Sequence, residues 1–141
     1  MKKNIAVVGC GQWGKNLVRN FSEIGSLYSI CDLNTDISNK YAIQYKVKAS
    51  TFEETINDPN IKGVVLTVPA HLHAPMAIKA MNKGKNVFVE KPLSLNETEA
   101  QLMISTSKEN RVQLMVGHLL QYHPIFNTIK KMLRNGEIGD L

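Results

Sequence analysis

Long hydrophobic runs are absent from this sequence of 141 residues. Its apolar runs, such as Gly63–Leu66, are far shorter than the roughly 20 residues that a membrane-spanning helix needs. The apolar run near the N-terminus, Ile5–Val8, is also too short for the hydrophobic region of a signal peptide. We therefore predict no membrane span and no targeting segment, and we expect a cytoplasmic protein.

Cysteine is scarce, and the charge is only mildly one-sided. Cys10 and Cys31 both end apolar runs, so we expect free thiols in the core rather than a disulfide. The net charge is +5, from 17 basic and 12 acidic residues, and the basic residues are scattered along the chain. No stretch interleaves them with aromatic residues as a nucleic-acid face would, so we predict no nucleic-acid partner. A mildly basic surface would suit an anionic small molecule, and ordinary solvated side chains explain it equally well.

Short runs rich in β-branched residues alternate with helical patterns along the chain. The predicted strands are Ile5–Val8, Leu27–Cys31, Val64–Val68, Val87–Val89 and Val112–Val116. Several of them are apolar on both faces, as strands of a sheet covered on both sides should be. The composition, 43% hydrophobic and 21% charged, is that of a globular domain. Together these features predict an α/β fold with a doubly wound parallel sheet, the Rossmann architecture.

Helix signals fill the segments between these runs. The predicted helices lie near residues 13–24, 36–44, 50–57, 74–81, 94–107 and 124–133. Two of them begin at the spacing of a capping box, Ser50 with Glu53 and Ser94 with Glu97. After Gly136 another strand pattern begins and the chain looks cut off. We therefore expect a dinucleotide-binding domain over residues 1–120, and over 121–141 a connecting helix and the start of a C-terminal domain that is missing here.

The stretch Gly9-Cys10-Gly11-Gln12-Trp13-Gly14 is a G-x-G-x-x-G motif between a predicted strand and a predicted helix. In a dinucleotide-binding loop, Gly9 permits the tight turn and Gly11 lets a pyrophosphate approach the backbone N–H groups of the helix N-terminus. Gly14 would allow the helix to pack closely on the strand. The alternative is a glycine-rich turn with a purely structural role.

Asp32 ends the second predicted strand, 18 residues after Gly14. A carboxylate at this position would bond the adenosine ribose hydroxyls and repel a 2′-phosphate, which favours NAD over NADP. Alternatively, Asp32 is an N-cap or turn residue, although Asn34 and Asp36 could also cap the helix that follows.

Thr67 and Val68 end the next predicted strand, and Pro69 follows it, ahead of His71 and His73. They lie where the carboxyl ends of parallel strands bind ligands, so contact with a cofactor or substrate is the functional interpretation. The spacing of the two histidines could suggest a metal, but no cysteine or carboxylate stands nearby to complete a site, and we predict no metal. Capping or surface roles are the alternative for these histidines, and for His118 and His123 further on.

Glu90, Lys91 and Pro92 leave the strand Val87–Val89 at the same expected edge of the sheet. Pro92 biases Lys91 towards an extended backbone, which constrains the direction of its side chain. A lysine ammonium beside a nicotinamide could donate a hydrogen bond to a sugar oxygen or, with a lowered pKa, act as a base. Taken alone, the same three residues would more often be a charged turn.

Three stretches together resemble the Gfo/Idh/MocA oxidoreductases, a family that includes glucose–fructose oxidoreductase and inositol dehydrogenase. They are "AVVGCGQWGKN", "TVPAHLHAPMAIKAMNKGKNVFVEKPLSLN" and "VGHLLQYHPIF". Within the family, "GCGQWGKNLVRNF" and "GHLLQYHP" are most similar to bacterial dehydrogenases of UDP-N-acetyl-aminoglucuronate.

The resemblance implies an NAD-dependent oxidoreductase acting on a sugar or UDP-sugar, with Lys91 as the catalytic residue. It implies that the cofactor is held by Gly9, Gly11, Gln12, Trp13, Gly14, Asp32, Thr67, Val68, Pro69, His73 and Glu90. Family members also carry a second α/β domain that binds substrate and usually forms oligomers, so a homo-oligomer is expected for the full-length protein. Without that domain this chain is expected to be inactive, and a non-catalytic NAD-binding module or an inactive remnant remain the rival interpretations.

Overall fold

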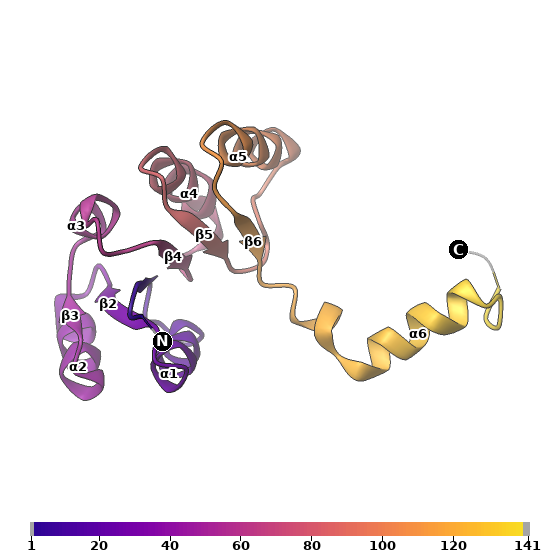
Figure 1. The fold of residues 1–141 in the computed structure, drawn as a ribbon, viewed down its shortest axis with the longest axis horizontal. Coiled ribbons are helices and arrows are strands. Elements are labelled where there is room, and N and C mark those ends of the chain that lie inside the picture. Colours follow the sequence, from indigo (N-terminus) through magenta and orange to yellow (C-terminus); the bar gives the residue numbers. More distant parts are fainter. Residues whose placement is uncertain (1, 140–141) are drawn as a thin grey trace.

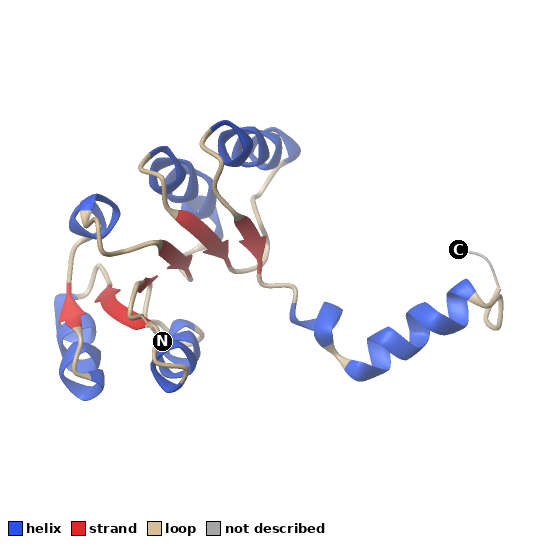
Figure 2. Ribbon diagram, viewed as in Figure 1, coloured by secondary structure: helices blue, strands red, loops and turns tan. Residues whose placement is uncertain are grey.

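A parallel sheet of six strands runs through the computed structural model, which describes residues 2–139. The strands lie in the order β3-β2-β1-β4-β5-β6, and every neighbouring pair is parallel (Figure 2). Their bounds are β1 Ile5–Val8, β2 Leu27–Cys31, β3 Lys48–Ala49, β4 Gly63–Leu66, β5 Asn86–Val89 and β6 Leu114–Val116. The predicted parallel α/β architecture is therefore confirmed.

Helices cover both faces of this sheet. One face carries α1 and α2, and the other carries α3, α4 and α5 (Figure 1). The helices are α1 Gly14–Glu23, α2 Thr35–Tyr45, α3 Phe52–Asn57, α4 His73–Asn82, α5 Glu97–Glu109 and α6 Pro124–Arg134, with short 3₁₀ turns η1 Ala70–Leu72 and η2 Leu119–Tyr122. Because the sheet is covered twice, its central strands are apolar on both sides.

The two central strands show this double burial most clearly. In β1, Val7 packs with the α1 side, whereas Ala6 and Val8 pack with the α3–α5 side. In β4, Val65 and Leu66 divide between the same two clusters, and both are at most 2% exposed. Side chains that alternate along a strand thus hold both helical layers to one sheet.

The strand order reverses between β1 and β4. From β1 the chain proceeds outward to β2 and β3, and after α3 it returns to β4 and proceeds outward the other way to β5 and β6. After β1 and β4 the chain therefore continues to opposite faces of the sheet, to α1 and α4 respectively. Such a reversal is where open α/β sheets bind their ligands.

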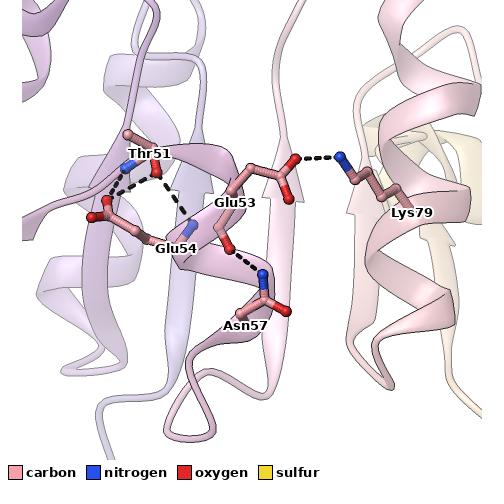
Figure 3. A network of polar contacts seen from close by, with 5 residues as sticks. All are labelled: Thr51, Glu53, Glu54, Asn57 and Lys79. Carbon is pink, nitrogen blue, oxygen red and sulfur yellow. Dashed lines mark hydrogen bonds and ion pairs between the residues drawn. The ribbon is translucent and has the colours of Figure 1, made fainter.

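Several element boundaries differ from the sequence-based expectation. The two-residue strand β3 was not among the predicted runs, because a strand this short carries no readable alternation. Helix α3 is capped by Thr51, whose hydroxyl accepts a hydrogen bond from the Glu54 backbone N–H, and the Glu54 carboxylate accepts one from the Thr51 N–H at 2.7 Å (Figure 3). The capping box is thus one residue later than Ser50 with Glu53.

Helix α5 shows a similar shift. Asn96 is its N-cap, with its side-chain oxygen accepting from the Glu99 N–H at 2.9 Å, whereas Ser94 donates to the Asn96 carbonyl. The expected pair of Ser94 with Glu97 is wrong by two residues. Asparagine caps helices as well as serine does, so the local pattern held two competing starts.

A short polar network links α3 to α4. Glu53 forms an ion pair with Lys79, and the Asn57 side chain donates to the Glu53 carbonyl at 2.8 Å (Figure 3). Both charged side chains are more than half exposed, 53% for Lys79 and 59% for Glu53. Exposed pairs of this kind contribute at most about 1 kcal/mol, so burial rather than this contact fixes α3.

Helix α6 extends away from the sheet (Figure 1). Every residue of α6 is at least partly exposed, including the large apolar side chains of Ile125 and Ile129. The predicted start at Pro124 is confirmed. Glu137 and Ile138 lie in a turn rather than in the strand expected after Gly136, and residues 140–141 of that expectation lie outside the described residues. Among residues 2–139 no helix is long and apolar enough to span a membrane.

Lys85 is a buried cation that ties the start of β5 to the chain before β4. Its ammonium donates to the carbonyl oxygens of Asp58 at 2.7 Å and Ile61 at 2.9 Å, and only 6% of the residue is exposed. Burial lowers the pKa of Lys85, and the nearby charge of Lys62 lowers it further.

We predict that Lys85→Met lowers the free energy of unfolding by about 2 kcal/mol, because two charge-assisted hydrogen bonds are lost from a buried site. Urea denaturation measures the change. The matched control is Lys83→Met, whose side chain is exposed two residues earlier, with an effect within about 0.5 kcal/mol. Equal changes in the two variants would show that the buried hydrogen bonds of Lys85 contribute nothing to the free energy of unfolding.

Candidate functional site

The loop after β1 is pressed against the end of β4. Gly9 has a φ of +91°, a conformation that favours glycine, and its N–H donates to the Cys31 carbonyl at 2.8 Å. The Thr67 hydroxyl donates to the Val8 carbonyl at 3.1 Å and also contacts the Gly9 carbonyl. A Cβ on Gly9 would lie 2.9 Å from the Thr67 backbone. This loop can therefore close over β4 only with glycine at position 9.

Gly14 is closely packed, whereas Gly11 borders open space. Gly14 is buried at the start of α1, where a Cβ would overlap the Gly9 carbonyl oxygen and the Thr67 hydroxyl. Gly11 is exposed, and a Cβ there would meet nothing within 4 Å among the described residues. The N-terminus of α1 also has no side-chain cap and no acidic residue in its first turn. The Lys15 and Asn16 N–H groups donate to the Gly11 and Trp13 carbonyls, and the open space beside this helix N-terminus fits a bound pyrophosphate.

Asp32 lies at the carboxyl end of β2 beside this loop. Its Oδ2 accepts from the Cys10 N–H at 2.6 Å, and its Oδ1 accepts from the Asn34 N–H at 2.9 Å. The N-cap of α2 is Asn34, whose side chain accepts from Asp36 and Ile37. Asp32 therefore has a turn role but does not cap α2. Each of its oxygens keeps lone-pair capacity for a ligand hydroxyl.

Cys10 and Cys31 are free and buried, as predicted. Burial raises the pKa of the Cys10 thiol to about 12, with the Asp32 carboxylate as the next cause. Burial likewise raises the pKa of Cys31 to about 11, again with Asp32 as the next cause. Because the thiolate is the reactive form, these thiols are inert packing groups at neutral pH.

Glu90 follows β5 and is held on three sides. The Trp13 indole Nε1–H donates to Glu90 Oε1 at 2.7 Å, and the Lys91 backbone N–H donates to Oε2 at 3.2 Å. A Cβ on Gly117 would lie 3.0–3.1 Å from the carboxyl atoms of Glu90, so the backbone after β6 forms the third wall. Only 7% of Glu90 is exposed. The residue before Lys91 thus has a fixed carboxylate.

His73 holds the other side of Lys91. Its Nδ1 lies 2.7 Å from the Pro92 carbonyl oxygen, and its Nε2 lies 2.9 Å from the Val68 carbonyl oxygen. The ring is 2% exposed. Both ring nitrogens are therefore engaged by the protein and neither faces a metal ion. Lys91 itself is exposed and lines the cleft described below, while its neighbours Glu90 and Pro92 are held by hydrogen bonds.

These groups line a cleft of about 260 Å³ at the carboxyl ends of β4 and β5. Its lining residues are Trp13, Thr67, Val68, Ala70, His73, Glu90, Lys91 and Leu119. Ligand pockets usually measure about 300–1,000 Å³, so this cleft suits one end of a longer ligand. The open side of the glycine loop can hold the remainder.

A second hollow of about 240 Å³ lies between β2, β3 and α3. It is lined by Tyr28, Ser29, Lys48, Ala49, Ser50, Glu54, Thr55, Asp58 and Ile61. An irregularity in the pairing of β1 with β2 falls at this point, and the buried Ser29 hydroxyl has no hydrogen-bond partner within residues 2–139. This hollow lies away from the carboxyl ends of β1 and β4, so we assign the candidate site to the first cleft.

The structure brings together most residues that the sequence singled out. Trp13, Thr67, Val68, His73, Glu90 and Lys91 share the cleft, while Gly9, Gly11, Gly14 and Asp32 line the adjoining loops. Gln12 is exposed on the glycine loop, and Pro69 is exposed before η1, outside the cleft lining. No group of three or more His, Cys, Asp or Glu side chains in the described chain could hold a metal ion.

Three contributors were missed as individual residues. Ala70 and Leu119 line the cleft, and Gly117 packs on Glu90. Gly117 and Leu119 directly follow β6, whose carboxyl end meets the same edge as that of β5. Their position after a parallel strand was the available signal.

Known proteins are similar to this chain over nearly its whole length. A family model described as an oxidoreductase family with an NAD-binding Rossmann fold matches residues 3–118. An uncharacterized oxidoreductase of Streptococcus pneumoniae is 33% identical over 96% of this chain, and the inositol 2-dehydrogenase of Salmonella typhimurium is 28% identical over 99%. The solved UDP-N-acetylglucosamine 3-dehydrogenase of Acidithiobacillus ferrooxidans superposes on 91% of the chain with a TM-score of 0.84 at 23% identity, a likeness of fold.

The relatives are much longer than this chain. The match covers 37% of the Streptococcus protein, 44% of the Salmonella enzyme and 42% of the Acidithiobacillus structure. The chain therefore spans about two fifths of the length of the proteins that it resembles.

We predict opposite outcomes for alanine at two positions of the glycine loop. Gly14→Ala should lower the free energy of unfolding by about 3 kcal/mol, because its Cβ overlaps fixed backbone atoms. Gly11→Ala should change stability by no more than about 0.5 kcal/mol, since its Cβ meets open space. Urea denaturation of both variants measures the difference in stability. A Gly11→Ala variant as unstable as Gly14→Ala would contradict the open space that the structure shows beside Gly11.

Proposed function

Because this chain belongs to the oxidoreductase family with an NAD-binding Rossmann fold, we propose that it holds NAD(H) along the carboxyl ends of its strands and presents it to a sugar. The reaction is hydride transfer between a hydroxyl-bearing sugar carbon and the nicotinamide. When bound, the cofactor supplies the hydride acceptor or donor.

One observation supports this proposal most strongly: the continuous line from Asp32 through the glycine loop to the cleft at Lys91. Asp32 offers carboxylate oxygens for ribose hydroxyls, and Gly11 leaves open space beside the uncapped N-terminus of α1. The cleft beyond is lined by Trp13 and Lys91. A molecule with a ribose at one end, phosphates in the middle and a flat ring at the other fits this order.

Lys91 is the residue to which we assign the catalytic role. Its neighbours Glu90 and Pro92 are held by Trp13 and His73, which fixes the backbone from which the ammonium projects. A lysine so placed can donate a hydrogen bond to the reacting oxygen of a sugar and take or return its proton. The remaining cleft residues bind and orient rather than exchange protons.

The substrate is a sugar, cyclic polyol or nucleotide-sugar. Two similar proteins, an inositol 2-dehydrogenase and a UDP-N-acetylglucosamine 3-dehydrogenase, support this class. A UDP-N-acetyl-aminoglucuronate oxidised during surface-polysaccharide synthesis is the finer proposal, and it rests on the sequence stretches around Gly9–Phe21 and Gly117–Pro124. In this proposal residues 1–120 bind the cofactor in the cytoplasm, and 121–141 connect them to a substrate domain that also forms a homo-oligomer.

A non-catalytic NAD-binding module is the second candidate. The exposure of Lys91 favours it, because a reacting group usually lies in a site from which water is excluded. The two candidates agree on the cofactor and differ on whether the chain acts on a sugar.

Cofactor selection tests the role of Asp32. NADH should bind at least about tenfold more tightly than NADPH, because a carboxylate at the ribose repels a 2′-phosphate. Asp32→Asn, which keeps an oxygen acceptor but removes the charge, should narrow that difference to less than about threefold. Calorimetric titration with both cofactors measures it.

The control for this experiment is Asp36→Asn, which removes an exposed carboxylate from the first turn of α2. It should leave the preference unchanged. NADPH binding to the unaltered chain as tightly as NADH would refute the assignment of Asp32.

The second prediction concerns turnover. The 141-residue chain should bind NAD(H) yet produce no steady NADH from NAD with inositol or UDP-sugars, followed by absorbance. Reacting atoms must be held within roughly 3–3.5 Å, and Lys91 projects from an open cleft.

In an active protein of the relatives' length, Lys91→Ala should reduce turnover by about a hundredfold or more. Full turnover by this longer Lys91→Ala protein would contradict the catalytic role of Lys91. Enzyme-like NADH production by the 141-residue chain would contradict its predicted inactivity.

A further inference from the structure

Trp13 occupies a position that tryptophan fills poorly. It is the N-cap residue of α1, where Ser, Thr, Asp or Asn normally accepts a hydrogen bond from the first turn. An indole has no acceptor and only one N–H donor, and α1 accordingly has no side-chain cap. The side chain is also 48% exposed, so burial of its ring does not account for it. Its one polar group is directed elsewhere.

That polar group bonds Glu90, 77 positions along the chain. The bond of 2.7 Å joins the loop after β1 to the loop after β5. Glu90 is nearly buried, and within residues 2–139 no cation forms an ion pair with it. The carboxylate thus depends on two N–H donors, the Trp13 indole and the Lys91 backbone. Loss of either donor leaves a buried charge under-satisfied.

We infer that Trp13 is a positioning residue that couples occupancy of the glycine loop to the placement of Lys91. The indole holds one oxygen of the Glu90 carboxylate, and the other oxygen holds the Lys91 backbone N–H. A ligand seated against Gly11 and the first turn of α1 orders the segment that carries Trp13, and therefore also the backbone at Lys91. This inference rests on the proposed function for the identity of that ligand, but the contact itself does not.

The test is hydrogen exchange of the Lys91 backbone amide, followed by NMR on the 141-residue chain with and without NADH. Trp13→Phe keeps an aromatic ring but removes the N–H donor. It should accelerate Lys91 exchange about tenfold, which corresponds to about 1.4 kcal/mol. With each protein saturated by NADH, the cofactor should slow Lys91 exchange in the unaltered chain but not in Trp13→Phe.

Two comparisons separate positioning from a general loss of stability. Arg19→Ala alters an exposed residue of the same helix and should leave Lys91 exchange unchanged. In a Glu90→Ala background, Trp13→Phe should have no further effect, because the coupling passes through the carboxylate. An effect that persists in that background, or equal exchange in Trp13→Phe and the unaltered chain, would overturn the inference.

A second variant decides the matter if Trp13→Phe does not fold. Glu90→Gln removes the charge that the indole contacts, so the Trp13 Nε1–H resonance should move upfield from its carboxylate-bonded position. An unmoved resonance would show that the contact is absent in solution. If the unaltered chain binds no NADH, the proposed function and the coupling of NADH binding to Lys91 are both refuted. The exchange rates measured without NADH then still decide whether Trp13 holds the Lys91 backbone through Glu90.

Discussion

The close approach of Gly9 and Gly14 to Thr67 sets the distance between the loops after β1 and β4. No side chain fits between them, so the first turn of α1 lies directly above the switch in strand order. This single constraint brings Trp13 within reach of Glu90 and places the open side of Gly11 beside the cleft. A larger loop would separate the first turn of α1 from Lys91.

Lys91 is an exposed residue whose two chain neighbours are held by other parts of the fold. Glu90 is fixed by an indole from the β1 loop, and the Pro92 carbonyl is fixed by a histidine from the β4 segment. The two clamps come from the two sides of the strand-order reversal. The backbone at Lys91 is therefore tied to the loops after β1 and β4.

The main parts of the site were predictable because parallel strands present their carboxyl ends at one edge. Gly9, Asp32, Thr67 and Lys91 each follow an apolar run, and that position alone predicted a common rim. Contacts across the rim were not predictable. The partnership of Trp13 with Glu90 depends on loop packing over 77 residues, and no local pattern encodes it.

Helix starts show the same limit on a smaller scale. Thr51 with Glu54 and Ser50 with Glu53 have the same spacing, and only the packing of α3 selects the former. The two-residue strand β3 exists because β2 offers it hydrogen bonds, not because its own residues favour extension. Apart from β3, local chemistry thus predicted the strands and the α-helices, whereas tertiary contacts decided where α3 and α5 begin.

A crystal structure of the chain with bound NADH would test the central claim most directly. The account predicts the adenosine ribose hydroxyls within about 3.2 Å of the Asp32 carboxylate, the pyrophosphate over Gly11 and the N-terminus of α1, and the nicotinamide in the cleft beside Trp13 and Lys91. A dinucleotide bound elsewhere, or one with its adenine in the Lys91 cleft, would contradict it.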